Sequence, residues 1–447
     1  MTSIDEFWTP IYNAFDPWRP LFGKELELYF VPRTDLPPEN NPLYGMRVEF
    51  TGSRLPLKVL LTGHRGSGKT SALADLVNQL GEKFFVVWLD VERSTDIFNV
   101  NHVEVLFLMG VVAFKVAEAA LEKKPDRALL DSMVDSLNTL VQEQTGKGEF
   151  QVDVDKILDN VVSFGLGFAA ALPSPITATM TGLALALKGV RFTLGLSEET
   201  VRKLEVKPKI SEIVAKLNDL LTEIQEKADR QILFIVDGLD KVEVEQARTI
   251  FAESLVLREP LCHIVYTAPI LLYYSTDFSS ARQLFTTYEF PNVRLYERGK
   301  RDTLNSKGYE LMRRVVYKRL RALELDPEAV IAEGALNNLI AKSGGVMREL
   351  ISLMRDACVK ARLMGRTMID EEIAEKAIYS FRRKYAAGLS EPYFEELKKV
   401  LELERPTGSE ICDRLLQNLY VLGYSNYDLW FDVHPNVLPL ITGVDLS

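Results

Sequence analysis

The stretch that decides the fold reads Gly63-His64-Arg65-Gly66-Ser67-Gly68-Lys69-Thr70, and it directly follows the apolar run Leu57–Thr62. It satisfies G-x-x-x-x-G-K-[ST] at every constrained position. The glycines let the backbone curl so that successive amide N–H groups and a helix N-terminus point at a phosphate. In such a loop the lysine reaches the outer phosphates of a nucleotide, and the Thr70 hydroxyl binds Mg²⁺. We therefore predict a triphosphate-binding loop that extends from Gly63 to Ser71.

A second motif, Leu233-Phe234-Ile235-Val236-Asp237-Gly238-Leu239-Asp240, ends another apolar run. Its apolar residues indicate a buried strand with Asp237 at the carboxyl end, where open α/β sheets bind ligands. We predict that Asp237 holds Mg²⁺, usually through water, and that Asp240 polarises the water that attacks the terminal phosphate. Capping of a helix N-terminus is the alternative role for Asp240.

Apolar runs that alternate with helical patterns predict a doubly wound parallel sheet, an α/β fold. The expected strands are Leu57–Thr62, Phe84–Asp90, Gln231–Asp237, Leu261–Thr267 and a weaker Asn292–Tyr296. Thr267 ends the strand that follows the acidic one, so it is the candidate for a polar sensor of the attacking water. Capping of the loop that leads to Pro269 is the equal alternative for Thr267.

The chain length of 447 residues has room for several domains. We expect an N-terminal lead over 1–50, a P-loop NTPase core over 51–300 with an insertion at about 125–207, and two further parts. Residues 301–387 show helical patterns without strands and predict a helical lid. Residues 388–447 show two helices, a strand around Tyr427–Val433 and a last helix from Pro435, which is the order of a winged helix.

The net charge of −10 gives the chain no general attraction to nucleic acid. Three distant cysteines (Cys262, Cys358 and Cys412) lack metal-ligand spacing and favour a reducing compartment. The first residues show no secretory signal, so we expect a cytoplasmic protein.

One segment, Val161–Leu187, contains no charged residue. Pro173-Ser174-Pro175 divides it into arms that are too short to cross a bilayer of about 30 Å as helices. A buried hairpin or an oligomer contact is the favoured interpretation, and a lipid contact is the alternative.

Several motifs together resemble those of the AAA+ and STAND ATPases, and above all the origin-recognition-like ATPases and the bacterial signalling or phage-defence ATPases. They are the loop GHRGSGKT, the acidic sequence VDGLDK, the turn Gly344-Gly345-Val346-Met347-Arg348 in the lid and the winged-helix pattern. The resemblance covers roughly residues 50 to 440. It implies ATP and Mg²⁺ as ligands, ATP hydrolysis as the activity and a homo-oligomer or a protein effector as the partner.

The same resemblance assigns arginines to the terminal phosphate. Arg348 follows the Gly-Gly turn and corresponds to the lid arginine that contacts the γ-phosphate in cis, with an exposed helix arginine as the alternative. Arg282 corresponds to a finger offered to a neighbouring subunit, with Arg298 and Arg301 as rivals. Asp-Gly-Leu-Asp stands where AAA+ enzymes typically carry Asp-Glu, which favours slow, switch-like turnover.

The distribution of charge helps to choose among a protein, DNA and a membrane as the partner of the ATPase. Residues 390–447 carry four basic residues (Lys398, Lys399, Arg405 and Arg414) against ten acidic ones, so a protein-docking role is favoured over DNA binding. A basic cluster lies in the lid, at Arg313, Arg314, Lys318, Arg319 and Arg321. We prefer a regulatory ATPase that engages an effector in a bacterial conflict system. The alternatives are a DNA-associated ATPase of the origin-recognition or transposition-regulator kind, and a membrane-directed ATPase that uses Val161–Leu187.

Overall fold

The computed structural model describes residues 4–97, 99–145, 152, 155, 184–185, 209–274, 278–425 and 429–443. The chain divides into two compact units. The sheet unit comprises Met46–Thr62 and Asp75–Glu289, and the lid unit comprises Met1–Gly45, Gly63–Ala74 and Phe290–Ser447. The phosphate-loop sequence thus belongs to the lid unit, and helix α4 (Lys69–Leu80) runs through the division.

A parallel sheet in the order β3-β2-β4-β5-β1-β6 forms the centre of the sheet unit. Its strands are β1 (Lys58–Thr62), β2 (Phe85–Asp90), β3 (Ala184–Leu185), β4 (Ile232–Asp237), β5 (His263–Ala268) and β6 (Thr286–Glu289). Every residue of β1, β4 and β5 is buried, which explains why these strands read as continuous apolar runs. The prediction of a parallel α/β sheet is confirmed.

One expected strand is wrong. The sheet takes its last strand from Thr286–Glu289, which pairs with β1, and not from Asn292–Tyr296. Val293 and Leu295 are buried in the apolar core of the lid unit instead. The amide of Val293 also donates to the carbonyl of Gly345 at 3.1 Å. Both the apolar side chains and the backbone of this segment therefore contact the lid unit and not the sheet.

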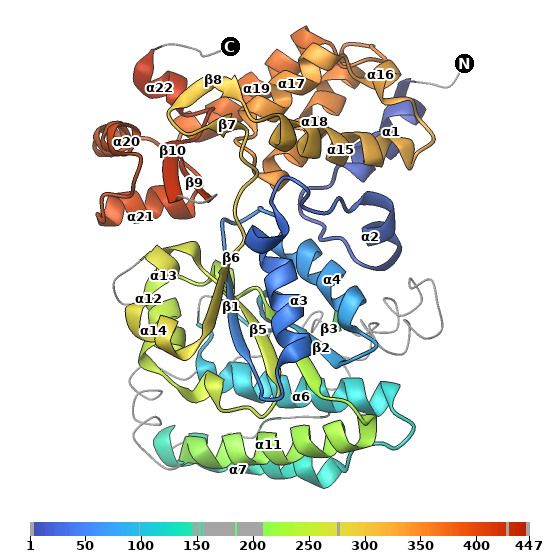
Figure 1. Cartoon of the computed structure of the whole chain (residues 1–447), viewed down its shortest axis with the longest axis vertical. Coiled ribbons are helices and arrows are strands. Elements are labelled where there is room, and N and C mark those ends of the chain that lie inside the picture. Colours follow the sequence, from blue (N-terminus) through green and yellow to red (C-terminus); the bar gives the residue numbers. More distant parts are fainter. Residues whose placement is uncertain are drawn as a thin grey trace. The chain divides into compact units, whose positions relative to one another are not determined.

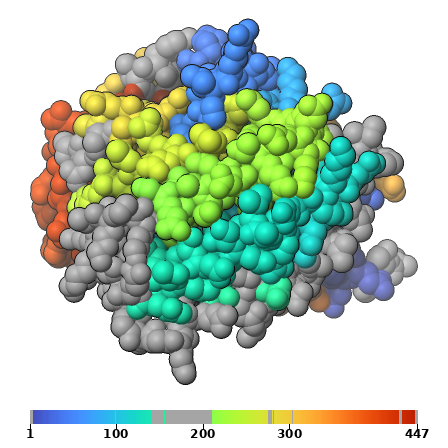
Figure 2. Space-filling model, turned by 90° about the horizontal axis from the view of Figure 1, so that it is seen from below, coloured from blue at the N-terminus to red at the C-terminus, as the bar shows by residue number. Residues whose placement is uncertain are grey.

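Three long helices cover one face of the sheet unit (Figure 1). They are α6 (His102–Ala120), α7 (Arg127–Thr145) and α11 (Lys209–Ala228). Helix α6 is apolar nearly all round because it contacts the sheet as well as α7 and α11. In Figure 2, α7 and α11 run side by side across the outside of this layer. Shorter helices complete the unit: α5 (Val91–Ser94), α12 (Val244–Arg248), α13 (Ile270–Tyr274) and α14 (Phe278–Leu284).

The uncharged segment Val161–Leu187 lies outside the described residues, apart from Ala184–Leu185 in β3. Within the part of the chain that the structure describes, no helix has the length and hydropathy that a membrane span requires.

The lid unit packs five long or medium helices around a second apolar core (Figure 1). These helices are α1 (Ile4–Ala14), α15 (Ser306–Arg321), α17 (Glu333–Lys342), α18 (Met347–Leu363) and α19 (Glu371–Ala386). Shorter helices are α2 (Gly23–Tyr29) and α16 (Pro327–Val330), while α3 (Pro42–Gly52) passes from this unit into the sheet unit. The expectation of a lid without strands is wrong, because β7 (Tyr296–Glu297) and β8 (Lys300–Leu304) form an antiparallel hairpin before α15.

The C-terminal segment has two helices, a strand pair and a last helix, in the expected order. Its elements are α20 (Glu391–Leu403), α21 (Glu410–Gln417), β9 (Val421–Ser425), β10 (Leu429–Val433) and α22 (Leu438–Thr442). Strands β9 and β10 pair antiparallel. Classification of this segment as a winged helix, and the domain boundaries given above, stay predictions.

Candidate functional site

The phosphate loop has a backbone that requires glycine. Gly63, Gly66 and Gly68 have φ values of +147°, +84° and +102°. A Cβ atom on Gly63 would lie 2.4 Å from the carbonyl oxygen of Phe290, and one on Gly66 would lie 2.8 Å from the Cβ atom of Arg348. At Gly68 a Cβ atom would meet no other atom within 4 Å, so there the φ angle alone selects glycine.

Lys69 lies buried against the loop that precedes it, with 4% of its surface exposed. Its ammonium group donates to the carbonyl oxygens of Gly63 at 2.9 Å and of His64 at 3.0 Å. These bonds fold the side chain back over the loop, where its positive charge faces the curled backbone. Contact of Lys69 with the phosphates of a nucleotide stays a prediction.

Two polar atoms of the same loop are buried without a hydrogen-bond partner among the described residues, Ser67 Oγ and His64 Nδ1. Burial and the nearby Lys69 lower the pKa of His64 to about 3, so the imidazole is neutral. Because its Nε2 accepts from the amide of Gly423 at 2.7 Å, its Nδ1 carries the proton. Ser67 Oγ is thus a buried hydroxyl without a partner among the described residues, a donor of the kind that fits a phosphate group.

Of the remaining loop residues, Arg65 lies in the turn before α4, and Thr70 and Ser71 lie in its first turn. Arg65 and Thr70 are half-buried, and the hydroxyl of Ser71 accepts a hydrogen bond from the amide of Leu21 at 3.1 Å. The N-terminal lead thus reaches the first turn of α4. Metal binding by Thr70 and nucleotide binding by Arg65 and Ser71 stay predictions.

The Gly-Gly turn of the lid lies directly against the phosphate loop. The amide of Arg348 donates to the carbonyl oxygen of Gly66 at 3.0 Å. Gly344 and Gly345 have φ values of +60° and +74°, and a Cβ atom on Gly345 would lie 1.8 Å from the carbonyl oxygen of Val293. The guanidinium of Arg348 lies 5.3 Å from the ring centre of Trp18. The backbone at Arg348 is therefore fixed at the loop, while contact of its side chain with a γ-phosphate stays a prediction.

The acidic motif ends β4 as expected. Asp237 is its last residue, and Asp240 lies in a short 3-10 helix over Leu239–Lys241. Both carboxylates are largely buried, and Asp237 Oδ1 accepts from the amide of Gly238 at 2.9 Å. The hydroxyl of Thr267 accepts from the same amide, also at 2.9 Å. The structure therefore brings Thr267 to the acidic strand end, on the neighbouring strand β5.

Sequence reasoning did not assign a role to Asp90, although the acid at the end of the apolar run Phe84–Asp90 was a usable signal. Asp90 pairs in register with Asp237 across β2 and β4. Burial, and then the charge of Asp237, raise the pKa of Asp90 to about 6. The carboxylate also accepts from the amide of Arg93 at 3.2 Å as the N-cap of α5. The site thus contains a pair of interacting carboxyl groups and not a single acid.

We expect wild type to lose stability as the pH rises and the Asp90 carboxyl group ionises, and we expect Asp90→Asn to lack this loss. The pKa of Asp90 is about 6 in the folded chain against an ordinary 3.8, so the folded state keeps its proton longer and the free energy of unfolding falls as pH rises from about 4 to 6. Asparagine keeps the cap and carries no charge. The quantity to compare is the free energy of unfolding of Asp90→Asn minus that of wild type. This difference should be about 1–2 kcal/mol more favourable to the variant at pH 8 than at pH 4, measured by urea unfolding in Mg²⁺-free buffer. A difference that stays constant between these pH values would contradict the assignment.

The proposed finger arginines have different surroundings. Arg282 is exposed on α14, with its guanidinium 5.9 Å from the ring centre of Tyr273. Arg298 forms an ion pair with Glu404 at 2.8 Å, and Arg301 forms one with Asp432. Both rivals are thus engaged with the C-terminal segment, and the assignment of Arg282 stays a prediction.

Comparison with known proteins identifies the core. Residues 48–259 match the KAP family P-loop domain, a range that includes the phosphate loop and the acidic motif. This part of the chain is thus similar to a P-loop NTPase domain. None of the curated proteins compared with this sequence matches it.

Some solved structures are similar to this chain at low identity and low TM-score. The ORC2 protein of Aeropyrum pernix, in ADPNP–ADP complexes, has a TM-score of 0.41 and 13% identity, over 96% of this chain and 95% of its own. Cdc6p of Pyrobaculum aerophilum has a TM-score of 0.40 and 13% identity, over 96% and 98%. RuvB of Thermotoga maritima has a TM-score of 0.27 and 15% identity, over 56% and 85%. Scores and identities this low imply no shared ligand or partner.

Proposed function

We propose that the protein is an ATP-binding and ATP-hydrolysing switch whose nucleotide state is passed to the lid and the C-terminal segment, and from there to a partner. The partner is a second copy of the chain or an effector protein. The observation that carries this proposal is that the phosphate loop is bonded at two points within the lid unit. Gly66 accepts from the amide of Arg348 on α18, and His64 accepts from the amide of Gly423 in β9.

Further contacts connect these two points. The hydroxyl of Tyr424, next to Gly423, donates to the carbonyl of Gly344 at 2.8 Å. Glu349, next to Arg348, contacts His434 at 2.6 Å, and the ring of His434 stacks on Tyr385. A change of the loop at His64 or Gly66 therefore acts on a buried polar network that includes both the lid and the C-terminal segment.

The residue types of the phosphate loop and of the acidic motif support hydrolysis of a nucleoside triphosphate. The loop amides and Lys69 would bind the phosphates, while Thr70 and Asp237 are the oxygen donors suited to Mg²⁺, which neutralises charge on the phosphates when bound. Asp240 would accept the proton of the attacking water, with Thr267 orienting that water. The choice of ATP among nucleotides, and a setting in bacterial conflict, are part of the proposal and come from the resemblance.

The test combines hydrogen exchange with light scattering. In wild type, ATP with Mg²⁺ should change the exchange protection of the peptide that contains β9 and should increase the scattering mass. Asp240→Asn should show the same changes and keep them for longer, because binding is retained while hydrolysis slows. Lys69→Ala should show neither change, and ADP serves as the control ligand.

The outcomes separate the activity from the switch. If wild type hydrolyses ATP while β9 exchange and scattering mass stay constant, the chain is an ATPase and the switch proposal fails. If added duplex DNA stimulates turnover in a salt-sensitive way, the DNA-associated alternative replaces the effector interpretation. Flotation with liposomes tests the membrane-directed alternative at Val161–Leu187.

A further inference from the structure

Helix α15 is strongly basic in an acidic protein. It carries six basic residues and one acidic residue, whereas the whole chain has a net charge of −10. Leu311, Val315 and Val316 are buried in the core of the lid unit. Arg314 and Arg321 are exposed and lie seven residues apart, on one side of the helix. Apart from the buried Arg319, the cations therefore lie outside a helix whose apolar side is already covered.

The basic side borders a groove. A cavity of about 510 Å³ lies between α15 and the segment Phe30–Pro32 of the N-terminal lead. From α15 it is lined by Glu310, Arg313, Arg314, Tyr317, Lys318 and Arg321. Four of these six residues are cations, so the groove is a concave positive surface that concentrates the local potential.

Some cations of the groove already have partners within the lid unit. Arg314 donates to the hydroxyl of Thr34 at 3.2 Å. Lys318 donates to the carbonyl oxygen of Phe30 at 2.7 Å. The Thr34 hydroxyl is a neutral acceptor, so this bond leaves the charge of Arg314 in place. In the described ranges no acidic residue forms an ion pair with Arg314 or Arg321, whereas Arg313 pairs with Glu333 at 3.2 Å.

An aromatic ring lies among these cations. Tyr317 is half-buried in the groove, and the guanidinium of Arg321 lies 5.5 Å from its ring centre. Cations that track a phosphate backbone, combined with a ring on which a base stacks, make up the general chemistry of single-strand nucleic-acid binding. We propose that this groove binds single-stranded nucleic acid, with Arg314, Lys318 and Arg321 on phosphates and Tyr317 against a base.

A nucleic acid fits this surface better than a lipid bilayer does. Binding of a helix to a membrane requires an apolar face that enters the interface. The apolar side of α15 is enclosed by the lid core, where Leu311, Val316 and Leu320 are almost fully buried. Only the charged side is accessible, in a groove and not on a flat patch. Attraction to anionic headgroups alone is then the remaining route to a membrane, and the test includes it.

The experiment measures anisotropy of a labelled oligothymidylate of about 20 nucleotides with the full chain, in salt from about 50 to 200 mM. Three phosphate contacts predict a log–log salt slope of about −2, at about −0.7 per contact. Arg314→Ala/Arg321→Ala should weaken binding at least about tenfold and make the slope shallower by about 1.4. Tyr317→Ala should weaken binding about fivefold or more at unchanged slope, and Tyr317→Phe should restore it.

Matched variants complete the design. Arg383→Ala/Lys384→Ala removes the same charge from exposed positions on α19 and should leave affinity within about twofold of wild type. Thermal melting shows that each variant is folded. Lys69→Ala should bind the oligonucleotide like wild type without nucleotide, so failure of the ATP switch and failure of the groove are distinguishable.

Three results would overturn the proposal. One is absence of oligonucleotide binding by wild type at the lowest salt. Another is an equal loss in the α19 control variant. The third is retention on vesicles of anionic phospholipid with the same dependence on Arg314 and Arg321, together with weak oligonucleotide binding, which would assign the groove to headgroups.

Discussion

Lys69→Ala should abolish measurable ATP turnover and weaken ATP binding, with a loss in turnover of at least about 10²–10³-fold, the range for removing one preorganised group that stabilises a transition state. The ammonium is the buried positive charge of the loop, held by the carbonyls of Gly63 and His64. Its removal leaves the amides without the charge that neutralises the outer phosphates. Phosphate release and titration with a fluorescent ATP analogue measure the two quantities.

Lys83→Ala is the matched control for this variant, because Lys83 is an exposed lysine just after α4. It should retain wild-type turnover. The Gly63 and His64 carbonyls lose a donor in Lys69→Ala, so a melting curve must show that the variant is folded before its kinetics are interpreted. Unchanged turnover in folded Lys69→Ala would refute the assignment of the phosphate loop.

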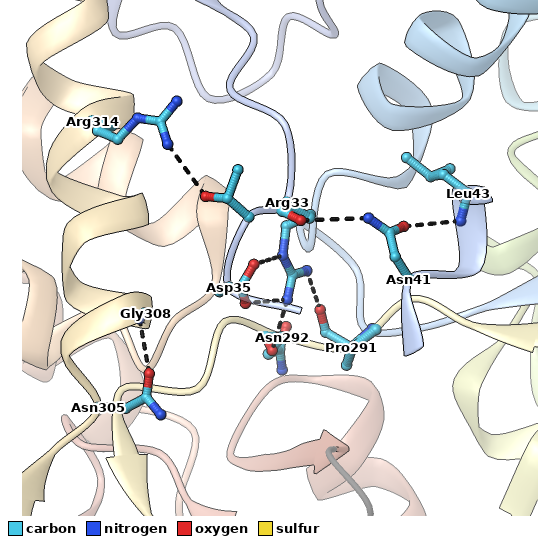
Figure 3. Close-up of polar contacts among 10 residues, drawn as sticks. Arg33, Asp35, Asn41, Leu43, Pro291, Asn292, Asn305, Gly308 and Arg314 are labelled. Carbon is cyan, nitrogen blue, oxygen red and sulfur yellow. Dashed lines mark hydrogen bonds and ion pairs between the residues drawn. The ribbon is translucent and has the colours of Figure 1, made fainter. Parts of the chain in front are cut away.

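The largest effect on stability is expected at Arg33. Its guanidinium forms a two-point ion pair with Asp35, at 2.7 and 2.8 Å, and the two side chains are only 3% and 4% exposed. It also donates to the carbonyl oxygens of Pro291 and Asn292 (Figure 3). Arg33→Ala leaves the Asp35 carboxylate buried without its counter-charge, which should lower the free energy of unfolding by about 3–5 kcal/mol.

The decrease in the free energy of unfolding should appear in the transition of the lid unit, since this unit contains all four residues: Arg33, Asp35, Pro291 and Asn292. Calorimetry is the suitable measurement, because a chain with two compact units need not unfold in one step. The double variant Arg33→Met/Asp35→Leu should lose less stability than Arg33→Ala, because it buries no unpaired charge. Equal losses in the two variants would show that the carbonyl contacts, and not the ion pair, carry the effect.

Local patterns were sufficient for much of the core. Strands β1, β2, β4 and β5 were found from sequence because a strand covered on both faces is a continuous apolar run. The phosphate loop was found because its backbone requires glycine at fixed spacing, which the φ angles of Gly63, Gly66 and Gly68 confirm. Most long helices of the lid were found in the same way, from the period of their buried residues.

The sequence alone could not show which distant segments pair through their backbones. Residues 301–387 show helical patterns in sequence, but Ile331 forms a bridge with Ile369 in the gap between α16 and α17. Strand β6 is polar and only half-buried, so its place at the sheet edge depends on pairing with β1.

Within the site, the sequence by itself determined the groups whose chemistry is local: the curled loop with Lys69, and Asp237 at the end of an apolar run. Only the tertiary structure decided which groups face them. Asp90 meets Asp237 through strand register, and Gly423 reaches His64 through folding of the lid unit. The reason is physical: a φ angle or a buried strand is set by neighbouring residues, whereas a pKa or a hydrogen bond between distant residues depends on packing that no local pattern encodes.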